Sequence, residues 1–229
     1  MVDQALTLGI DEAGRGAVLG PLVIAGCALT SRAADRLARA GVDDSKGFGP
    51  PERAQAIRAE LAALIEIEAA WTRIVIVDPE RVDASVRRKR LNVLEREVAE
   101  EIIRGAPSPV RIVLDGARLF GPLCLRIPNA VALDRADQQE ICVAAASILA
   151  KTRRDRCYDE IRARYEPLLG PIRGQGYPNR ATERFLRTYT ERHGCLPPEI
   201  RRSWSWEPLK AFTTADERGE APTLDFDSY

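Results

Sequence analysis

The order of apolar segments along the chain predicts an α/β or α+β fold, in which helices pack on a β-sheet. Short aliphatic runs come first, and helical patterns then alternate with further runs that end at Gly, Pro or Asp. The length of 229 residues suits one domain, or one domain with a small appendage. It is also enough to bury a sizeable core without disulfides.

Four short segments have the composition of β-strands, and a fifth is a candidate. They are rich in aliphatic and β-branched residues and cover residues 6–10, 22–29, 74–77, 110–114 and, as the candidate, 129–133. A Gly-rich turn of about ten residues separates the first two, so we expect these two strands to pair antiparallel.

Four other segments carry apolar residues at helical spacing, over residues 52–65, 83–103, 140–165 and 180–193. In the first of them, Ile57, Leu61 and Leu64 recur at i, i+4 and i+7, which places them on one face of a helix. The third is apolar in its first half and charged afterwards. We find no internal repeat.

Composition excludes several classes of protein. Hydrophobic residues make up 45% and charged residues 30%, which is typical of a globular rather than a disordered chain. No uncharged apolar run reaches about 18 residues, and the first residues lack the blocks of a signal peptide. Five cysteines without C-x-x-C spacing and one histidine, His193, are a poor zinc or disulfide framework. We therefore expect a cytoplasmic protein with reduced thiols.

The total charge is balanced, with 34 basic and 34 acidic residues, but its distribution is not. Residues 151–210 contain 14 Lys or Arg against 8 Asp or Glu, and residues 213–229 carry a net charge of −4. The sequence thus predicts a basic C-terminal third followed by an acidic tail.

Acidic residues follow apolar strands at separate points of the chain. Asp11 and Glu12 come directly after the first strand, and Asp115 comes after the strand at 110–114. Neighbouring side chains on a strand point to opposite faces, so Asp11 and Glu12 can share a site only if the strand ends there. Gly14 and Gly16 provide that freedom, although a surface turn with solvated acids would also explain the pair.

A third acidic segment contains Asp134 and Asp137 and leads into an Ala-rich helix. On this helix Ser147, Lys151 and Asp155 share one face, so Lys151 either pairs with Asp155 or lies near a phosphate. Carboxylates without histidine suit hard cations such as Mg²⁺ or Mn²⁺, which usually serve phosphate chemistry. Spacing alone does not show that these acids converge. The glycines at 14–20 fit neither a dinucleotide-binding nor a P-loop motif.

Taken together, the motifs resemble those of one family, the type 2 ribonucleases H known as ribonuclease HII. The resemblance covers about residues 7–210 and rests on segments in a fixed order: Gly9-Ile10-Asp11-Glu12-Ala13-Gly14-Arg15-Gly16 with Leu19-Gly20-Pro21, Asp44-Ser45-Lys46, Leu91-Asn92-Val93-Leu94, Leu114-Asp115-Gly116, Ala136-Asp137, residues 144–151 with Arg154-Asp155, Gly176-Tyr177-Pro178 and Arg202-Ser203-Trp204. The Arg between two glycines favours ribonuclease HII over HIII, which usually has Lys there.

The resemblance implies a ribonuclease H-like fold with a central mixed five-stranded sheet flanked by helices and a helical C-terminal extension. We expect a catalytic core at 1–165, a substrate-binding extension at 166–212 and a flexible acidic tail at 213–229. The implied substrates are RNA–DNA hybrids and duplex DNA with embedded single ribonucleotides, cut 5′ of the ribonucleotide to leave 3′-hydroxyl and 5′-phosphate ends. We expect a monomer, and nothing in the tail specifically indicates contact with a sliding clamp.

The resemblance also assigns roles to single residues. The implied metal ligands and catalytic residues are Asp11, Glu12, Asp115 and Asp137, which would hold two Mg²⁺ or Mn²⁺ ions with substrate bound. Asp137 rather than Asp134 matches the family motif. The backbone of Gly14, Arg15 and Gly16 would sense the 2′-hydroxyl, and Tyr177 would stack on the sugar beside the cut. Arg15, Lys46 and Lys151 are the candidate phosphate contacts.

The sequence departs from the family pattern at a few positions, among them those after Lys46 and at Asn179, and two alternative functions are open at this point. Lys46 is followed by Gly47-Phe48, where many relatives have another Lys or a Thr and then Leu. Asn179 stands where many have Thr or Ser. A different metal-dependent nuclease of the same fold, such as a junction resolvase, is one alternative; a non-enzymatic hybrid-binding protein is the other. The Gly-Arg-Gly and Gly-Tyr-Pro segments and the four acids favour the ribonuclease.

Overall fold

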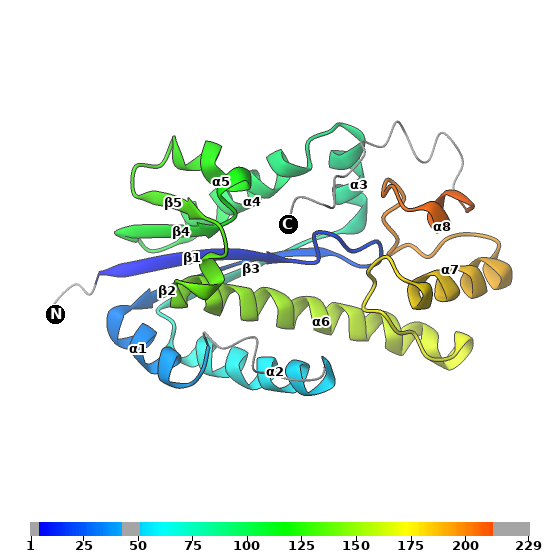
Figure 1. Ribbon diagram of the computed structural model, residues 1–229, viewed down its shortest axis with the longest axis horizontal. Coiled ribbons are helices and arrows are strands. Elements are labelled where there is room, and N and C mark those ends of the chain that lie inside the picture. The colour runs from blue at the N-terminus through cyan, green and yellow to red at the C-terminus, as the bar shows by residue number, and fades with distance from the viewer. Residues whose placement is uncertain (1–4, 43–50, 213–229) are drawn as a thin grey trace. The chain divides into compact units, whose positions relative to one another are not determined.

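The structure, a computed structural model, describes residues 5–42 and 51–212 (Figure 1). Its sheet has five strands in the order β3-β2-β1-β4-β5. The strands are β1 (Leu6–Ala13), β2 (Leu22–Thr30), β3 (Trp71–Val77), β4 (Arg111–Asp115) and β5 (Ala130–Leu133). All five strands predicted from the sequence are therefore present.

The sheet is mixed, as the resemblance implied. β1 pairs antiparallel with β2 from the rung Leu6–Thr30 to the rung Ala13–Val23, which confirms the predicted pairing. On its other side β1 runs parallel to β4, and β4 runs parallel to β5. Parallel strands deliver their carboxyl ends to the same edge of a sheet, so residues that follow β1 and β4 become neighbours.

The helices in chain order are α1 (Ser31–Arg39), α2 (Pro51–Glu68), α3 (Pro79–Arg87), α4 (Leu91–Gly105), α5 (Ala117–Cys124), α6 (Ile141–Leu169), α7 (Arg180–His193) and α8 (Glu207–Lys210). The helix at 180–193 was predicted correctly, whereas the single helix predicted at 83–103 was wrong. Two helices lie there, because Lys89 takes a left-handed backbone with φ 55° between them. The short helices α1, α5 and α8 were not predicted.

Helices cover both faces of the sheet, with α6 on one side and α4 on the other (Figure 1). A Cβ atom built on Gly9 of β1 would lie 2.2 Å from the backbone carbon of Cys142 in α6. On the opposite face, a Cβ on Gly26 of β2 would lie 2.4 Å from Ile102 of α4. Glycine at these two positions therefore lets each helix approach the sheet closely.

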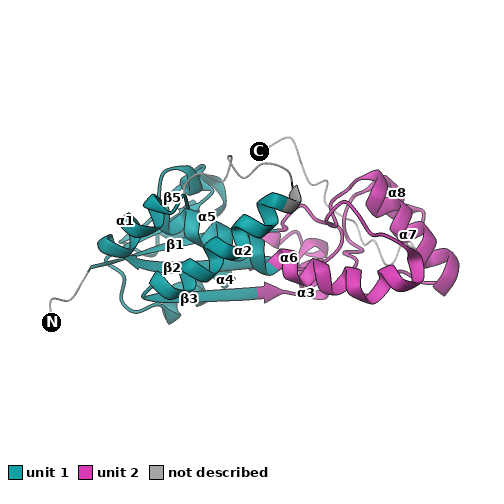
Figure 2. Ribbon diagram, turned by 90° about the horizontal axis from the view of Figure 1, so that it is seen from below, with its two compact units in different colours: residues 1–13, 23–75, 95–153 teal, residues 14–22, 76–94, 154–229 magenta. Residues whose placement is uncertain are grey.

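The chain divides into two compact units, each made of three segments (Figure 2). Unit 1 contains residues 1–13, 23–75 and 95–153, and it holds most of the sheet. Unit 2 contains residues 14–22, 76–94 and 154–229. These units are discontinuous in sequence, so the division at 165 and 212 stays a prediction, and residues 213–229 lie outside the described ranges.

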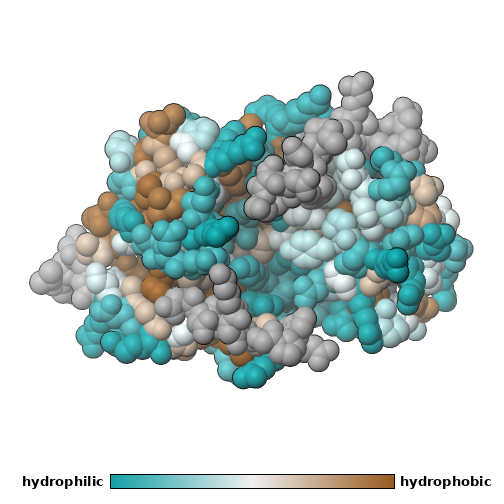
Figure 3. Space-filling view, in the orientation of Figure 1, coloured by the Kyte–Doolittle hydropathy of each residue, from teal (hydrophilic) through white to brown (hydrophobic). Residues whose placement is uncertain are grey.

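The surface in Figure 3 mixes hydrophilic side chains with smaller apolar groups. Within residues 5–42 and 51–212, no helix is long and apolar enough to cross a membrane. The five cysteines are free thiols, of which Cys27 and Cys142 are buried and Cys195 is exposed.

Candidate active site

Two aspartates lie next to each other because the strands that carry them run parallel. The pairing of β1 with β4 ends at the rung Ile10–Leu114, and Asp11 and Asp115 are the next residues on each strand. Neighbouring strands lie about 5 Å apart, so the two side chains start from adjacent points. The sheet register therefore brings together two of the predicted metal ligands.

Asp11 is the more buried of the two, at 5% exposure. Burial raises the pKa of its carboxyl well above the usual range, and the neighbouring Glu12 carboxylate raises it further. The hydrogen bond with the Ser147 hydroxyl lowers the pKa of Asp11 in part. The charge of Asp115 raises this pKa, and the Lys151 ammonium lowers it. A buried carboxyl among like charges is a group that a cation would stabilise in its ionised form.

Asp115 is half-buried and linked to the next loop. Burial raises the pKa of Asp115, and the N–H of Ala136 opposes this by donating to Oδ1 at 2.6 Å. The carboxylates of Asp137 and Asp134 raise this pKa as well. Charge interactions thus run from Asp137 to Asp115 and from Asp115 to Asp11.

Asp134 and Asp137 differ in what their side chains do. Asp134 accepts a hydrogen bond from the N–H of Ala117 at 2.8 Å, and Ala117 is the first residue of α5. Asp134 therefore satisfies a backbone donor at the start of that helix. Asp137 lies in a short 3₁₀ helix, Ala136–Gln138, which follows a left-handed residue, Arg135 with φ 56°. This difference favours Asp137 over Asp134 as the ligand that the loop contributes.

The expectation that the first strand ends before Asp11 was wrong. β1 continues to Ala13, since its partner β2 keeps pairing with it, and Glu12 stands opposite Ile24. Asp11 and Glu12 therefore follow each other on an extended strand, and strand geometry alone does not direct the Glu12 side chain to the site of Asp11, so the role of Glu12 as a ligand stays a prediction. They still interact: the Glu12 N–H donates to Asp11 Oδ1 at 2.7 Å, and the Glu12 charge raises the pKa of Asp11.

Lys151 lies one helical turn after Ser147 on α6, and its charge acts on both Asp11 and Asp115. The sequence left open whether Lys151 pairs with Asp155 or contacts a phosphate. The structure places the Lys151 ammonium within electrostatic reach of the carboxylates. A single cation near several acids compensates only part of their charge.

The donor chemistry of this cluster fits a hard divalent cation. Asp11, Asp115 and Asp137, together with the neighbouring Glu12, offer oxygen atoms only. Burial raises the pKa of Asp11 and Asp115, and nearby carboxylates raise both further. Among the described residues, no group of three or more Asp, Glu, His or Cys side chains is arranged as a ready-made metal site. The acids are thus coupled by charge, and their joint ligation of an ion stays a prediction.

The glycine-rich segment after β1 belongs to unit 2 and is bonded to the Gly-Tyr-Pro loop. The carbonyl of Gly176 accepts hydrogen bonds from the N–H groups of Val18 at 2.8 Å and Leu19 at 3.0 Å. Gly176 has φ 77°, and a Cβ there would lie 2.4 Å from the Leu19 carbonyl oxygen, so a side chain would force the loops apart. The glycine-rich segment and the Gly-Tyr-Pro loop, about 160 residues apart in sequence, are therefore joined by backbone hydrogen bonds.

A buried arginine fixes the conformation of the Gly-Arg-Gly segment, and the sequence analysis did not identify it. Arg201 is fully buried and donates from Nε to the carbonyl of Gly20 and from Nη1 to the carbonyl of Arg15, both at 3.0 Å. Its guanidinium stacks over the Trp204 ring at 4.9 Å. Arg201 precedes the matched Arg202-Ser203-Trp204 motif, which was the one available sequence signal.

A buried carboxylate supports the same C-terminal segment. Asp83 of α3 accepts hydrogen bonds from the N–H groups of Arg202 at 2.8 Å and Ser203 at 3.1 Å, and from the Ser203 hydroxyl at 2.5 Å. The chain on either side of Arg201 is therefore tied to α3, within unit 2.

Tyr177 rests on a second buried arginine. Arg154 is 3% exposed, its guanidinium lies 4.8 Å from the centre of the Tyr177 ring, and its Nη2 donates to the carbonyl of Gln175 at 2.5 Å. A Cβ on Gly14 would lie 2.5 Å from Arg154 Nε, so Gly14 packs against the same guanidinium. Tyr177 itself is 38% exposed, which leaves ring surface available for a ligand.

Asn179 has a structural role in this loop. Its Oδ1 accepts hydrogen bonds from the N–H groups of Ala181 and Thr182 and thereby caps α7. Its Nδ2 donates to the carbonyls of Gly174 at 3.0 Å and Tyr177 at 2.9 Å. The departure from Thr or Ser noted in the sequence thus supplies both a helix cap and a loop anchor.

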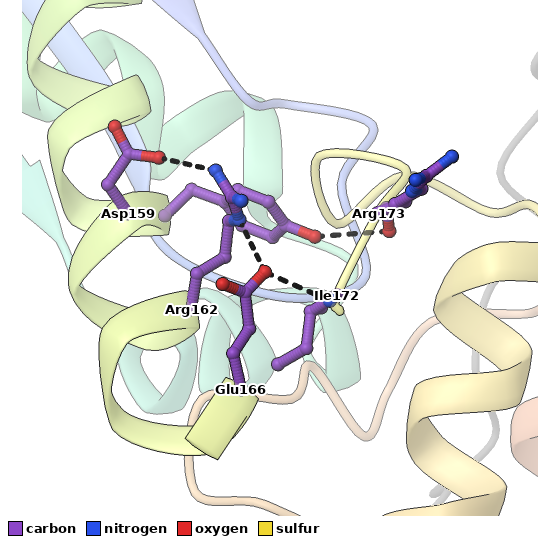
Figure 4. Close-up of polar contacts among 6 residues, drawn as sticks. Asp159, Arg162, Glu166, Ile172 and Arg173 are labelled. Carbon is purple, nitrogen blue, oxygen red and sulfur yellow. Dashed lines mark hydrogen bonds and ion pairs between the residues drawn. The ribbon is translucent and has the colours of Figure 1, made fainter. Parts of the chain in front are cut away.

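The segment between α6 and this loop is held by charged side chains at the end of α6 (Figure 4). Glu166 Oε1 accepts hydrogen bonds from Arg162 Nε at 2.8 Å and from the N–H of Ile172 at 3.0 Å. Arg162 also pairs with Asp159 at 3.3 Å. The chain that enters the Gly-Tyr-Pro loop is therefore anchored before it reaches Tyr177.

The remaining predicted phosphate contacts have different outcomes. Arg15 donates from Nη2 to the side-chain oxygen of Asn92 at 2.5 Å, so its guanidinium is oriented by α4. Lys46, with Gly47-Phe48, lies outside the described residues, and its predicted role is untested.

Comparison with known proteins identifies the family. A family model described as Ribonuclease HII matches residues 8–206. A curated relative described as Ribonuclease HII, from Caldivirga maquilingensis, is 35% identical over 207 residues, which are 88% of this chain and 92% of the relative. The chain belongs to the ribonuclease HII family. Members of this family are endoribonucleases that cleave the RNA strand of RNA–DNA hybrids.

Two solved structures of ribonuclease HII relatives share the fold. Ribonuclease H2 from Pyrococcus horikoshii OT3 superposes with a TM-score of 0.77 at 29% identity, covering 90% of this chain and 98% of that one. Ribonuclease HII from Archaeoglobus fulgidus, solved in complex with PCNA, has a TM-score of 0.73 at 34% identity, with coverages of 87% and 95%. The predicted ribonuclease H-like fold is thereby confirmed.

Proposed function

We propose that this ribonuclease HII incises duplex DNA on the 5′ side of single embedded ribonucleotides, in addition to hydrolysing the RNA strand of hybrids. The products are a 3′-hydroxyl and a 5′-phosphate. The observation that carries the proposal is the adjacency of Asp11 and Asp115 at one edge of the sheet, directly before the loop that contains Gly14. This arrangement combines acids for phosphate chemistry with a backbone that can contact a 2′-hydroxyl.

The acidic cluster supplies the chemistry in this proposal. Asp11, Glu12, Asp115 and Asp137 would hold divalent cations, Mg²⁺ or Mn²⁺, which would supply a lowered pKa for a water nucleophile and stabilisation of charge on the departing 3′ oxygen. Burial, with a further contribution from neighbouring carboxylates, raises the pKa of Asp11 and Asp115, and this environment supports the role because a bound cation would stabilise their ionised forms. No side-chain nucleophile is needed, which agrees with a chain that has a single histidine.

The glycine-rich segment supplies the selectivity for a ribonucleotide. Gly14 follows Glu12 by two residues, so their Cα atoms are at most about 7 Å apart whatever the loop conformation. Arg201 holds the carbonyls of Arg15 and Gly20, so the amides and carbonyls of this segment are preorganised to contact a 2′-hydroxyl. Tyr177, supported by Arg154, stacks on the neighbouring sugar.

The experiment is a nicking assay on a DNA duplex with one ribonucleotide, supplied with Mg²⁺ or Mn²⁺. We expect a single cut on the 5′ side of that nucleotide, and product mapping should show the 3′-hydroxyl and 5′-phosphate ends. An all-DNA duplex of the same sequence is the control and should remain intact. If well-folded protein cuts only long hybrids and leaves the duplex with a single ribonucleotide intact, the proposed incision at embedded ribonucleotides is wrong.

A further inference from the structure

The turn between α3 and α4 presents four consecutive basic residues, Arg87, Arg88, Lys89 and Arg90, all exposed. We call these four residues the basic turn. Within residues 5–42 and 51–212, the side chains of Arg87, Arg88 and Lys89 form no hydrogen bond or ion pair. Many other exposed arginines are paired with acids, for example Arg73 with Glu101. The positive charge of Arg87, Arg88 and Lys89 is therefore not neutralised by any side chain in the described part of the chain, and these three residues can attract an anion.

The backbone of this turn is fixed by hydrogen bonds. The N–H of Lys89 donates to the carbonyl of Val86 at 2.8 Å, and the N–H of Arg90 donates to the carbonyl of Ser85 at 2.8 Å. These two bonds form a Schellman motif, the common ending of an α-helix. The carbonyl of Arg90 then accepts from Leu94 at 3.0 Å, which starts α4. The charges thus sit on an ordered turn between two helices.

Lys89 occupies the position of this motif where glycine is usual. Its φ is 55°, a left-handed conformation that strains a residue with a side chain. A strained residue that is not required by packing points to a role for its side chain. Lys89 is exposed, so burial of its side chain does not explain this conformation.

The basic turn is linked to the segment that we assign to ribonucleotide recognition, and both belong to unit 2. Asn92 follows Arg90 by two residues and accepts the hydrogen bond from Arg15 Nη2. The chain length from Arg88 to Asn92 limits their Cα separation to about 14 Å. DNA rises about 3.4 Å per base pair, so an anion bound at the turn would lie within a few nucleotides of one contacted by Arg15.

We propose that the basic turn binds phosphates of the substrate's sugar–phosphate backbone, a few nucleotides from the cut. Lys89 and its neighbours thereby add affinity that does not depend on base sequence. This inference rests on the proposed function, because it takes a nucleic-acid duplex as the ligand. It adds a contact surface that the carboxylates and the glycine-rich segment do not provide.

The test measures the salt dependence of binding to a duplex with one ribonucleotide, in an Asp115→Asn background that leaves the duplex uncut. Each phosphate contact contributes about 0.9 to the slope of log Kd against log salt concentration. For Arg88→Gln/Lys89→Gln we expect that slope to fall by about 2. The matched control is Arg32→Gln/Arg39→Gln, which removes two exposed charges from α1 in unit 1 and should leave the slope unchanged. The charge-preserving Arg88→Lys/Lys89→Arg should also keep it.

A second variant separates binding from folding. Lys89→Gly removes the charge and relieves the left-handed strain, so we expect a thermal midpoint at least as high as the parent's and a slope lower by about 1. An unchanged slope in Arg88→Gln/Lys89→Gln, or an equal fall in the α1 control, would overturn this inference even while the enzyme still nicks its substrate. If the unmodified chain neither binds nor cuts any hybrid, the proposed function fails instead.

Discussion

The two units of the molecule place functional residues by different physical means. In unit 1, strand pairing alone sets Asp11 beside Asp115, because both follow the last paired rung of parallel strands. In unit 2, buried charged side chains hold loops together: Arg201 binds two carbonyls and Asp83 binds the chain around it. The position of the acidic residues therefore depends on the register of the sheet, whereas the conformation of the recognition loops depends on a few buried polar side chains.

The largest effect on stability should come from the buried arginine of unit 2. Arg201→Met keeps much of the side-chain volume but leaves the carbonyls of Gly20 and Arg15 without a buried donor. We expect a loss of about 3 kcal/mol in the free energy of unfolding, measured by denaturant titration. Arg164→Met is the control, since Arg164 forms an ion pair with Glu199 at 60% side-chain exposure and should change stability by less than about 1 kcal/mol. If the two variants lost the same free energy of unfolding, the buried Arg201 would be no more important for stability than the exposed Arg164.

In unit 1 the expected effect has the opposite sign. Because the folded-state pKa of Asp11 is raised, the ionised carboxylate destabilises the fold, and this loss develops as pH rises from the unfolded value near 3.8 through the folded pKa. Asp11→Asn should therefore stabilise the metal-free protein by about 1 kcal/mol at neutral pH. The gain should vanish below the unfolded pKa, where Asp11 is protonated in both states.

Thermal melts across pH would measure that difference. Asp35→Asn, at an exposed position on α1, serves as the control and should give no pH-dependent gain. A destabilised Asp11→Asn at neutral pH would show that this carboxylate supports the fold rather than the chemistry.

A further effect, on catalysis rather than on stability, concerns the ring that Arg154 supports. Tyr177→Ala removes the stacking surface, and we expect kcat/KM for an embedded ribonucleotide to fall about 10-fold, the scale of one stacking contact. Tyr177→Phe keeps the ring over Arg154 and should remain within about twofold of the parent. If Tyr177→Ala and Tyr177→Phe had the same kcat/KM, the aromatic ring of Tyr177 would not contribute to substrate recognition.

The same contrast explains what the sequence could predict. Apolar runs that end in acids are local patterns, so the five strands and the acids that follow them were found. The strand was expected to stop before Asp11, because nothing local shows that β2 keeps pairing up to Val23. Likewise, a single helix was expected over residues 83–103, because no local pattern shows the left-handed turn at Lys89 that separates α3 from α4.

The supports in unit 2 could not be predicted in this way. Arg201 and Arg154 look like surface arginines in a basic segment, and their burial depends on carbonyls and rings far away in sequence. The family motif included Arg154 and Arg202-Ser203-Trp204 but gave no structural reason for them. Long-range hydrogen bonds to backbone carbonyls leave no periodic signal in the chain.

The most direct measurement compares asparagine variants of Asp115, at the end of β4, and Asp134, just after β5, in the nicking assay on a duplex with one embedded ribonucleotide. Asp115 lies at the acidic edge of the sheet, whereas Asp134 accepts a hydrogen bond from the start of α5, which an asparagine can also accept. We expect Asp115→Asn to lower the nicking rate by about 10³-fold or more, and Asp134→Asn to stay within a few-fold of the parent. Full activity of Asp115→Asn, with both variants folded and metal supplied, would contradict this expectation.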